Sequence, residues 1–132
     1  MALNNEKSYV LITSARNEKK YIEKTLNSVV CQTVLPKQWV IVSDGSTDGT
    51  DEIVFNYSKK HENIRLLRSE THNTRNFGSK VAAFRLGVES LRHLQYDFIG
   101  NLDADVSFDS HYFELLLKKP LCFFLSSQDE AN

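Results

Sequence analysis

Two aspartates, Asp103 and Asp105, follow a short apolar run at residues 98–102. An apolar run without polar alternation is typical of a strand that is buried on both faces of a parallel sheet. In open α/β sheets, ligands bind in the crevice beyond the carboxyl ends of the strands, where we expect these two side chains. At a spacing of two, they point to the same side of an extended chain. Two carboxylates on one side suit a hard divalent cation, Mg²⁺ or Mn²⁺, which can in turn hold a diphosphate.

Strands and helices alternate along the chain around these aspartates. Apolar runs predict strands at residues 9–13, 38–43, 64–67 and 98–102, with 121–125 as a candidate fifth strand. Helical periodicity predicts helices over residues 18–31, 51–60, 79–94 and from about 110 to about 119. The polar stretch 68–78 is expected to be a loop that borders the site. This order predicts an α/β fold, with a Rossmann-like, mostly parallel sheet and helices on both faces.

The apolar stripes of the helices predict which side chains are buried. In the helix over 18–31 the stripe consists of Ile22, Leu26, Val29 and Val30. In the helix over 79–94 it consists of Val81, Phe84, Val88, Leu91 and Leu94.

Short polar side chains just before the helices are the expected caps. Asn17 is the predicted N-cap of the first helix, and Glu18 adds a favourable charge to its first turn. Asp48 or Thr50 is expected to cap the second helix, and Asp109 or Ser110 is expected to cap the last one.

Length and composition indicate a single globular domain over residues 1–132, in which 41% of the residues are hydrophobic and 25% are charged. The net charge of -1 gives no overall field that would favour nucleic acid or an anionic membrane. Cys31 and Cys122 fit no metal-ligand spacing and are expected to be buried, reduced thiols, and the four histidines lack paired spacing. No apolar run is long enough to be a signal peptide core or a membrane span, which favours a cytoplasmic location, the membrane periphery included.

Three predicted strands each end in a polar segment. These segments are residues 12–18 (ITSARNE), 40–50 (VIVSDGSTDGT) and 101–105 (NLDAD). Their order and spacing resemble the inverting family 2 glycosyltransferases of the GT-A fold, and the resemblance runs from about residue 9 to residue 119. It implies a hexosyltransferase that binds a UDP- or GDP-sugar with the help of a divalent metal ion and transfers the sugar, with inversion, to an acceptor hydroxyl.

The resemblance also implies roles for individual residues. Ser14, Ala15 and Arg16 match the turn along the base and ribose, and Glu18 matches an acidic position that contacts the ribose. Asp44 matches the aspartate that binds the base, which is chemically sensible because a carboxylate accepts hydrogen bonds from the N–H groups of uracil or guanine. The expected donor-binding residues are Ser14, Ala15, Arg16, Glu18, Val42, Asp44, Lys80, Asp103, Ala104 and Asp105.

Two further roles concern the diphosphate. Lys80 matches a basic position that supplies a compact charge to it. Asp105 corresponds to the more direct metal ligand, and Asp103 lies nearer the ribose or sugar. The chain departs from the family at Ser43, where many members carry another aspartate, and at Arg16, where many carry an aromatic residue.

No residue of the chain is predicted to be the general base. In the family, the base and the acceptor-binding segment lie well beyond the Asp-x-Asp strand. Here Asp109 and Glu114 are interpreted as cap and surface residues, and residues 129–130 belong to a polar terminus. The sequence therefore predicts a C-terminally truncated fold with an atypical tail at 120–132. It also predicts donor binding without transfer, and a sheet edge open to self-association or a partner chain. The acceptor, whether glycan, lipid or small molecule, is not indicated.

Other hypotheses remain open at this point. Asp-x-Asp alone also fits a turn in which one aspartate is a cap and the other is solvated. A phosphohydrolase would use one aspartate as nucleophile and the other as acid/base, but it normally carries them after its first strand rather than its fourth. A nucleotide-binding remnant, or one half of a split enzyme, would hold the donor without turning it over.

Overall fold

Strands and helices alternate in the computed structural model of the chain, which describes residues 7–69 and 77–119. The elements are β1 (Tyr9–Ala15), α1 (Ile22–Val30), β2 (Gln38–Asp44), α2 (Thr50–Lys60), β3 (Ile64–Ser69), α3 (Phe77–Ser90), β4 (Phe98–Asn101) and α4 (Tyr112–Leu117). The predicted order of elements is thus confirmed. The candidate strand at 121–125, the tail at 120–132 and most of the predicted loop at 68–78 lie outside the described residues.

The described strands form one parallel sheet in the order β3-β2-β1-β4. β1 pairs with β2 up to Ala15 opposite Ser43, and it pairs with β4 up to Ile12 opposite Asn101. A backbone hydrogen bond from Leu102 to Ile12, at 2.9 Å, extends the second pairing by one residue. Because all strands run in the same direction, the segments that follow β1, β2 and β4 begin at the same edge of the sheet.

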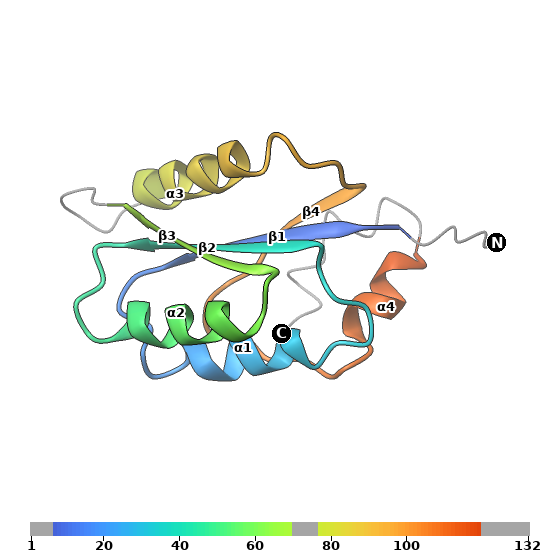
Figure 1. The fold of residues 1–132 in the computed structure, drawn as a ribbon, viewed down its shortest axis with the longest axis horizontal. Helices are drawn as coiled ribbons and strands as arrows, with labels where there is room; N and C mark the ends of the chain where they lie inside the picture. The colour runs from blue at the N-terminus through green and yellow to red at the C-terminus, as the bar shows by residue number, and fades with distance from the viewer. Residues whose placement is uncertain (1–6, 70–76, 120–132) are drawn as a thin grey trace.

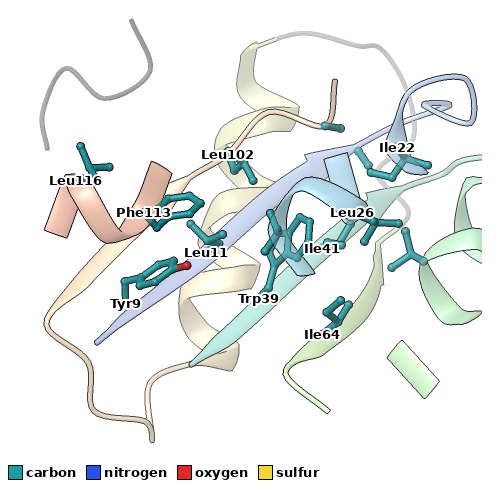
Figure 2. Packing of buried hydrophobic residues seen from close by; sticks show 14 residues of the cluster. Tyr9, Leu11, Ile22, Leu26, Trp39, Ile41, Ile64, Leu102, Phe113 and Leu116 are labelled. Carbon is teal, nitrogen blue, oxygen red and sulfur yellow. The ribbon is translucent and has the colours of Figure 1, made fainter. Parts of the chain in front are cut away.

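Helices cover both faces of this sheet (Figure 1). α3 lies over one face, and α1, α2 and α4 lie over the other. The side of α1 and α2 takes the alternate strand residues Tyr9, Leu11, Trp39 and Ile41, which Figure 2 shows together with their helical neighbours. The side of α3 takes Val10, Ile12, Val40 and Val42. Both faces of β1 and β2 are therefore dry, which explains why their sequences show no polar alternation.

Small residues let α3 lie close to the sheet. Ala83 is buried, and a Cβ atom built on Gly87 would lie only 2.6 Å from Cγ2 of Ile12. The predicted stripe was wrong at Val81, whose side chain is 37% exposed. Close packing through Ala83 and Gly87 turns the helix so that Val81 faces away from the sheet.

Two other burial predictions were wrong. β4 was expected to be covered on both faces, but it is the edge strand of the described sheet, and its Ile99 is 38% exposed. Among the described strands it pairs with β1 alone, which leaves part of its surface open. Cys31 is exposed rather than buried, because it follows the last residue of α1, where the apolar stripe has ended.

The helix caps differ from the predicted ones. α1 begins only at Ile22, and Asn17, with φ of 53°, lies in the preceding turn. The cap position of α2 is Gly49, with φ of 103°, and that of α4 is His111. The expected aspartates still bind N–H groups at these helix starts. Asp48 accepts from the backbone of Thr50 at 3.0 Å, and Asp109 accepts from the backbone of His111 at 2.8 Å.

Candidate functional site

The turns that follow β1 and β2, residues 16–21 and 45–50, are joined by hydrogen bonds, and we call them the paired turns. The backbone N–H groups of three consecutive residues in the first turn bind side chains of the second. Asn17 donates to Oγ of Ser46 at 3.0 Å, Glu18 to Oγ1 of Thr50 at 2.9 Å, and Lys19 to Oδ2 of Asp48 at 3.0 Å. In return, Oδ1 of Asn17 accepts from the backbone of Thr47 at 2.8 Å. The second turn thus satisfies donors that lie ahead of the first turn of α1.

Asp48 is the charged centre of the paired turns. Burial is the largest single effect and raises the pKa of Asp48, but hydrogen bonds from the Thr50 hydroxyl and from the backbone of Lys19 and Thr50 together outweigh it, so the pKa lies below its ordinary value. The carboxylate is therefore ionised at neutral pH and engaged in holding the two turns together.

Asp44 ends β2 and is almost fully buried, with 4% of its surface exposed. Its Oδ1 accepts a hydrogen bond from the hydroxyl of Ser69, the last residue of β3, at 3.2 Å. The backbone N–H of Gly45 donates to the carbonyl of the same serine at 3.0 Å. The end of β3 therefore fixes a carboxylate at the edge of the sheet.

Asp103 and Asp105 lie beyond β4 and are both exposed, on either side of the buried Ala104. The chain does not stay extended between them, as had been expected, because it enters a turn at Ala104. The methyl group of Ala104 packs in the core, and its carbonyl binds a side chain of α1, so the backbone bends towards that helix.

The side chain that binds the carbonyl of Ala104 is Thr25, whose role the sequence interpretation did not predict. Thr25 and Gln32 are buried polar residues that bind the backbone of residues 104–113. A signal was present, because Thr25 falls in register with the apolar stripe of Ile22 and Val29. A polar residue inside such a stripe is buried and needs a partner.

The remaining predicted residues surround these groups. Ser14 and Ala15 are the last residues of β1, and Ser14 pairs with Val42, whose fully buried side chain faces α3. Arg16 comes next, and its Nη1 is a buried donor that has no hydrogen-bond partner in the described structure. The exposed Lys80 lies in the first turn of α3, which Figure 1 shows at the end of the sheet where β2 and β3 terminate.

The two other acidic candidates have structural partners. Asp109 binds the start of α4, as described above. Glu114 accepts a hydrogen bond from the hydroxyl of Thr33 at 2.6 Å, and this bond, with a smaller contribution from Lys118, holds the pKa of Glu114 below its ordinary value.

The carboxylates beyond β4 suit a metal ion that is bound by the protein and a ligand together. The described residues contain no cluster of three or more His, Cys, Asp or Glu side chains that could hold an ion by themselves. Asp103 and Asp105 offer two exposed carboxylates beside a turn. Mg²⁺ and related ions are commonly held by one or two carboxylates, with water and substrate phosphates completing the shell. The residues present therefore fit Mg²⁺ or Mn²⁺ bound together with a diphosphate.

None of the helices in the described ranges has the length and hydropathy required to span a membrane. The cytoplasmic location stays a prediction.

Comparison with known proteins gives one family for most of the chain. Residues 10–119 match the family described as glycosyl transferase family 2. The dolichyl-phosphate beta-glucosyltransferase ALG5A of Trichomonas vaginalis is 36% identical over 117 residues, covering 83% of this chain and 34% of that protein.

Solved structures agree on the fold. TarS of S. aureus, in complex with UDP, has a TM-score of 0.64 at 27% identity, covering 83% of this chain and 30% of that one. The mannosyltransferase PcManGT from Pyrobaculum calidifontis, in complex with GDP-Man and Mn²⁺, has a TM-score of 0.59 at 26% identity, covering 78% of this chain and 29% of that one. The chain thus spans about a third of the length of each of these proteins.

Proposed function

The chain belongs to glycosyl transferase family 2, and from this premise we propose that it binds the nucleotide diphosphate of a UDP- or GDP-sugar at the carboxyl edge of its sheet. The observation that carries the proposal is the strand order. β1 lies between β2 and β4, so the turn with Arg16 has Asp44 on one side and the turn with Asp103 and Asp105 on the other. β2 and β3 are added to the sheet on one side of β1, and β4 is added on the other side. In open α/β sheets, ligands bind at the point where the strand order reverses in this way.

The nucleoside would lie along the paired turns. The buried carboxylate of Asp44 can accept hydrogen bonds from base N–H groups, and the end of β3 keeps it in place. Nη1 of Arg16 supports the same placement, because a buried guanidinium donor without a partner among residues 7–69 and 77–119 favours an acceptor from a ligand. Ser14, Ala15, Glu18 and Val42 complete this half of the proposed site, the last through its backbone.

The diphosphate would lie towards β4. Asp105, with Asp103 beside it, would hold the divalent ion, and Lys80 would add a positive charge from α3. The ion would supply charge neutralisation to the diphosphate as it leaves. In the family reaction, the bond between the acceptor oxygen and the anomeric carbon forms as the bond to the diphosphate breaks. The diphosphate keeps the bonding electrons, and the acceptor hydroxyl gives its proton to a base. We assign no residue of this chain to that base, and the sugar and acceptor stay open.

Nucleotide binding tests the proposal directly. Calorimetric titration with UDP and with GDP, each with Mn²⁺ or with a chelator, should show binding that Mn²⁺ strengthens. Asp105→Ala should remove the gain from Mn²⁺ and leave the metal-free affinity unchanged. The matched control is Glu62→Ala, which removes an exposed carboxylate just before β3. Glu62 lies at the amino ends of the strands, whereas the proposed site lies at their carboxyl ends. Absence of binding for both nucleotides would contradict the function, and equal binding with and without Mn²⁺ would contradict the metal site alone.

Transfer is a separate step and needs a separate measurement. Sugar release from UDP- or GDP-sugars that depends on an added acceptor hydroxyl would show turnover. Tight binding without any release would favour the alternative of donor binding alone. Release of phosphate from simple phosphate esters would favour the phosphohydrolase hypothesis.

A further inference from the structure

A single buried hydroxyl holds the turn that carries Asp105. Oγ1 of Thr25 lies 2.8 Å from the carbonyl oxygen of Ala104 and 2.7 Å from that of Val106, so its one hydrogen is shared between two acceptors. The same oxygen accepts the backbone N–H of Val106 at 3.0 Å. Asp105 is the residue between them, so the chain on both sides of it is bound to one side chain. Thr25 is 0% exposed, so water cannot replace these bonds.

Ser28 of α1 and Gln32, which follows the end of the helix, extend this attachment along the same segment. Nε2 of Gln32 donates to the carbonyl of Asp109 at 2.6 Å, and Oε1 of Gln32 accepts the N–H of Phe113 at 3.0 Å. The hydroxyl of Ser28, in the last turn of α1, accepts the N–H of Phe108 at 3.3 Å. These bonds therefore fix the position of residues 104–113 relative to α1.

α1 is also the element that continues from the paired turns. Its position is set at the start by the bonds of residues 17–19 to the turn after β2. The helix thus connects two parts of the site, the paired turns and the turn with Asp103 and Asp105 (the carboxylate turn), which lies about 80 residues beyond Thr25 in the chain. A helix is a stiff element, so it fixes the separation of these parts better than the loops alone.

We infer that Thr25 is a positioning residue for Asp103 and Asp105, whose hydroxyl holds their turn in the geometry that a diphosphate-bound divalent ion requires. The inference rests on the proposed function, because it assumes that these carboxylates bind a metal ion. It adds a residue that touches neither nucleotide nor metal and acts only through the backbone of the turn.

The test compares Mn²⁺ binding in matched threonine variants. The dissociation constant for Mn²⁺ is measured by electron paramagnetic resonance in the presence of saturating UDP, and the affinity for UDP alone is measured in chelator. Thr25→Val keeps the shape of the side chain and removes the hydroxyl, whereas Thr25→Ser keeps the hydroxyl. Thr13→Val is the control, since Thr13 is also 0% exposed and the variant loses a buried hydrogen bond, from Nε1 of Trp39, that does not involve the backbone of residues 104–106.

Thr25→Val should weaken Mn²⁺ binding by about 10-fold or more, the usual effect of removing a group that orients a metal ligand. Thr25→Ser and Thr13→Val should keep the wild-type constant, and all variants should bind UDP equally in chelator. Equal Mn²⁺ binding by Thr25→Val and wild type would overturn the inference and leave the proposed function intact. A parallel loss of Mn²⁺ binding and metal-free UDP binding would overturn it too, because that pattern indicates general damage.

Absence of Mn²⁺ binding in the wild type would instead refute the metal site in the proposed function, and the inference with it. Should Thr25→Val fail to fold, hydrogen exchange in the wild type decides the question. Mn²⁺ with UDP should then slow exchange of the Val106 amide, which Thr25 binds, and unchanged exchange would refute the coupling.

Discussion

Asn17 and Thr47 join the turns after two neighbouring strands, through a hydrogen bond of 2.8 Å from the backbone of Thr47 to Oδ1 of Asn17. The N–H of Asn17 donates back to Ser46 at 3.0 Å, so this residue binds the second turn in both directions. Its φ of 53° lies in the left-handed region, which asparagine adopts more readily than most residues. Asn17 therefore combines a backbone conformation and a side-chain acceptor that few other residues supply together.

Asn17→Ala should lower the free energy of unfolding by about 1–3 kcal/mol, because alanine is strained at this φ and lacks the acceptor. Asn17→Gly should cost less than Asn17→Ala, since glycine adopts positive φ freely and loses only the hydrogen bond. Asn17→Asp, which retains an acceptor, should lie nearest to the wild type. Urea denaturation measures all three, and equal losses in the alanine and glycine variants would contradict the role of φ.

Asp48 makes the stability of the paired turns dependent on pH. Since hydrogen bonds hold the pKa of Asp48 below its ordinary value, the folded state favours the ionised carboxylate. Its contribution is complete above the ordinary pKa of about 4 and is lost as the pH falls through the lower, folded value. In Asp48→Asn the amide oxygen can still accept from Thr50, but the amide nitrogen cannot accept the backbone N–H of Lys19, so the variant should be less stable than the wild type by about 0.5–1.5 kcal/mol at pH 7. The difference should shrink in urea titrations below about pH 4, and parallel curves would contradict this account.

The sequence predicted most of the fold because its signals are local. β1 and β2 are continuous apolar runs, and the stripe of Ile22, Leu26 and Val29 has the period of a helix that packs on one side. These features depend on residues that are close together in the chain and on which of them are buried. The apolar or polar character of the residues indicates both. The positions of the strand-end turns followed from the rule that parallel strands end at one edge.

What could not be predicted depends on partners far away in the chain. Asn17 has the chemistry of a cap, but the turn after β2 supplies it with another partner, Thr47. The importance of Thr25 arises from residues about 80 positions later. Val81 is exposed because α3 packs closely on the sheet where Gly87 meets Ile12. The spacing of apolar residues in the sequence gives no information on that contact.

Gly87 should tolerate no side chain. A Cβ at this position would lie 2.6 Å from Cγ2 and 3.0 Å from Cδ1 of Ile12, a fully buried residue of β1. Gly87→Ala should therefore destabilise the protein by about 1–3 kcal/mol through overpacking, although alanine favours helices by about 1 kcal/mol over glycine. Ile12→Ala makes room, so the double variant should lose less stability than the sum of the single variants in urea denaturation. Strict additivity would show that the close contact is not the cause.

Asp44 should discriminate among nucleobases if the nucleoside lies along the paired turns. Its carboxylate accepts hydrogen bonds, which suits the ring N–H of uracil, whereas the same ring position of cytosine is an acceptor. The wild type should therefore bind UDP more tightly than CDP. Asp44→Asn should weaken UDP binding by about 1–3 kcal/mol and reduce the difference between the two nucleotides, because an amide presents a donor as well as an acceptor. Calorimetry with both nucleotides checks the affinities, and urea denaturation of the same samples checks that the buried position, bonded to Ser69, remains intact. An equal loss for UDP and CDP would show that Asp44 supports the end of β2 instead of contacting the base.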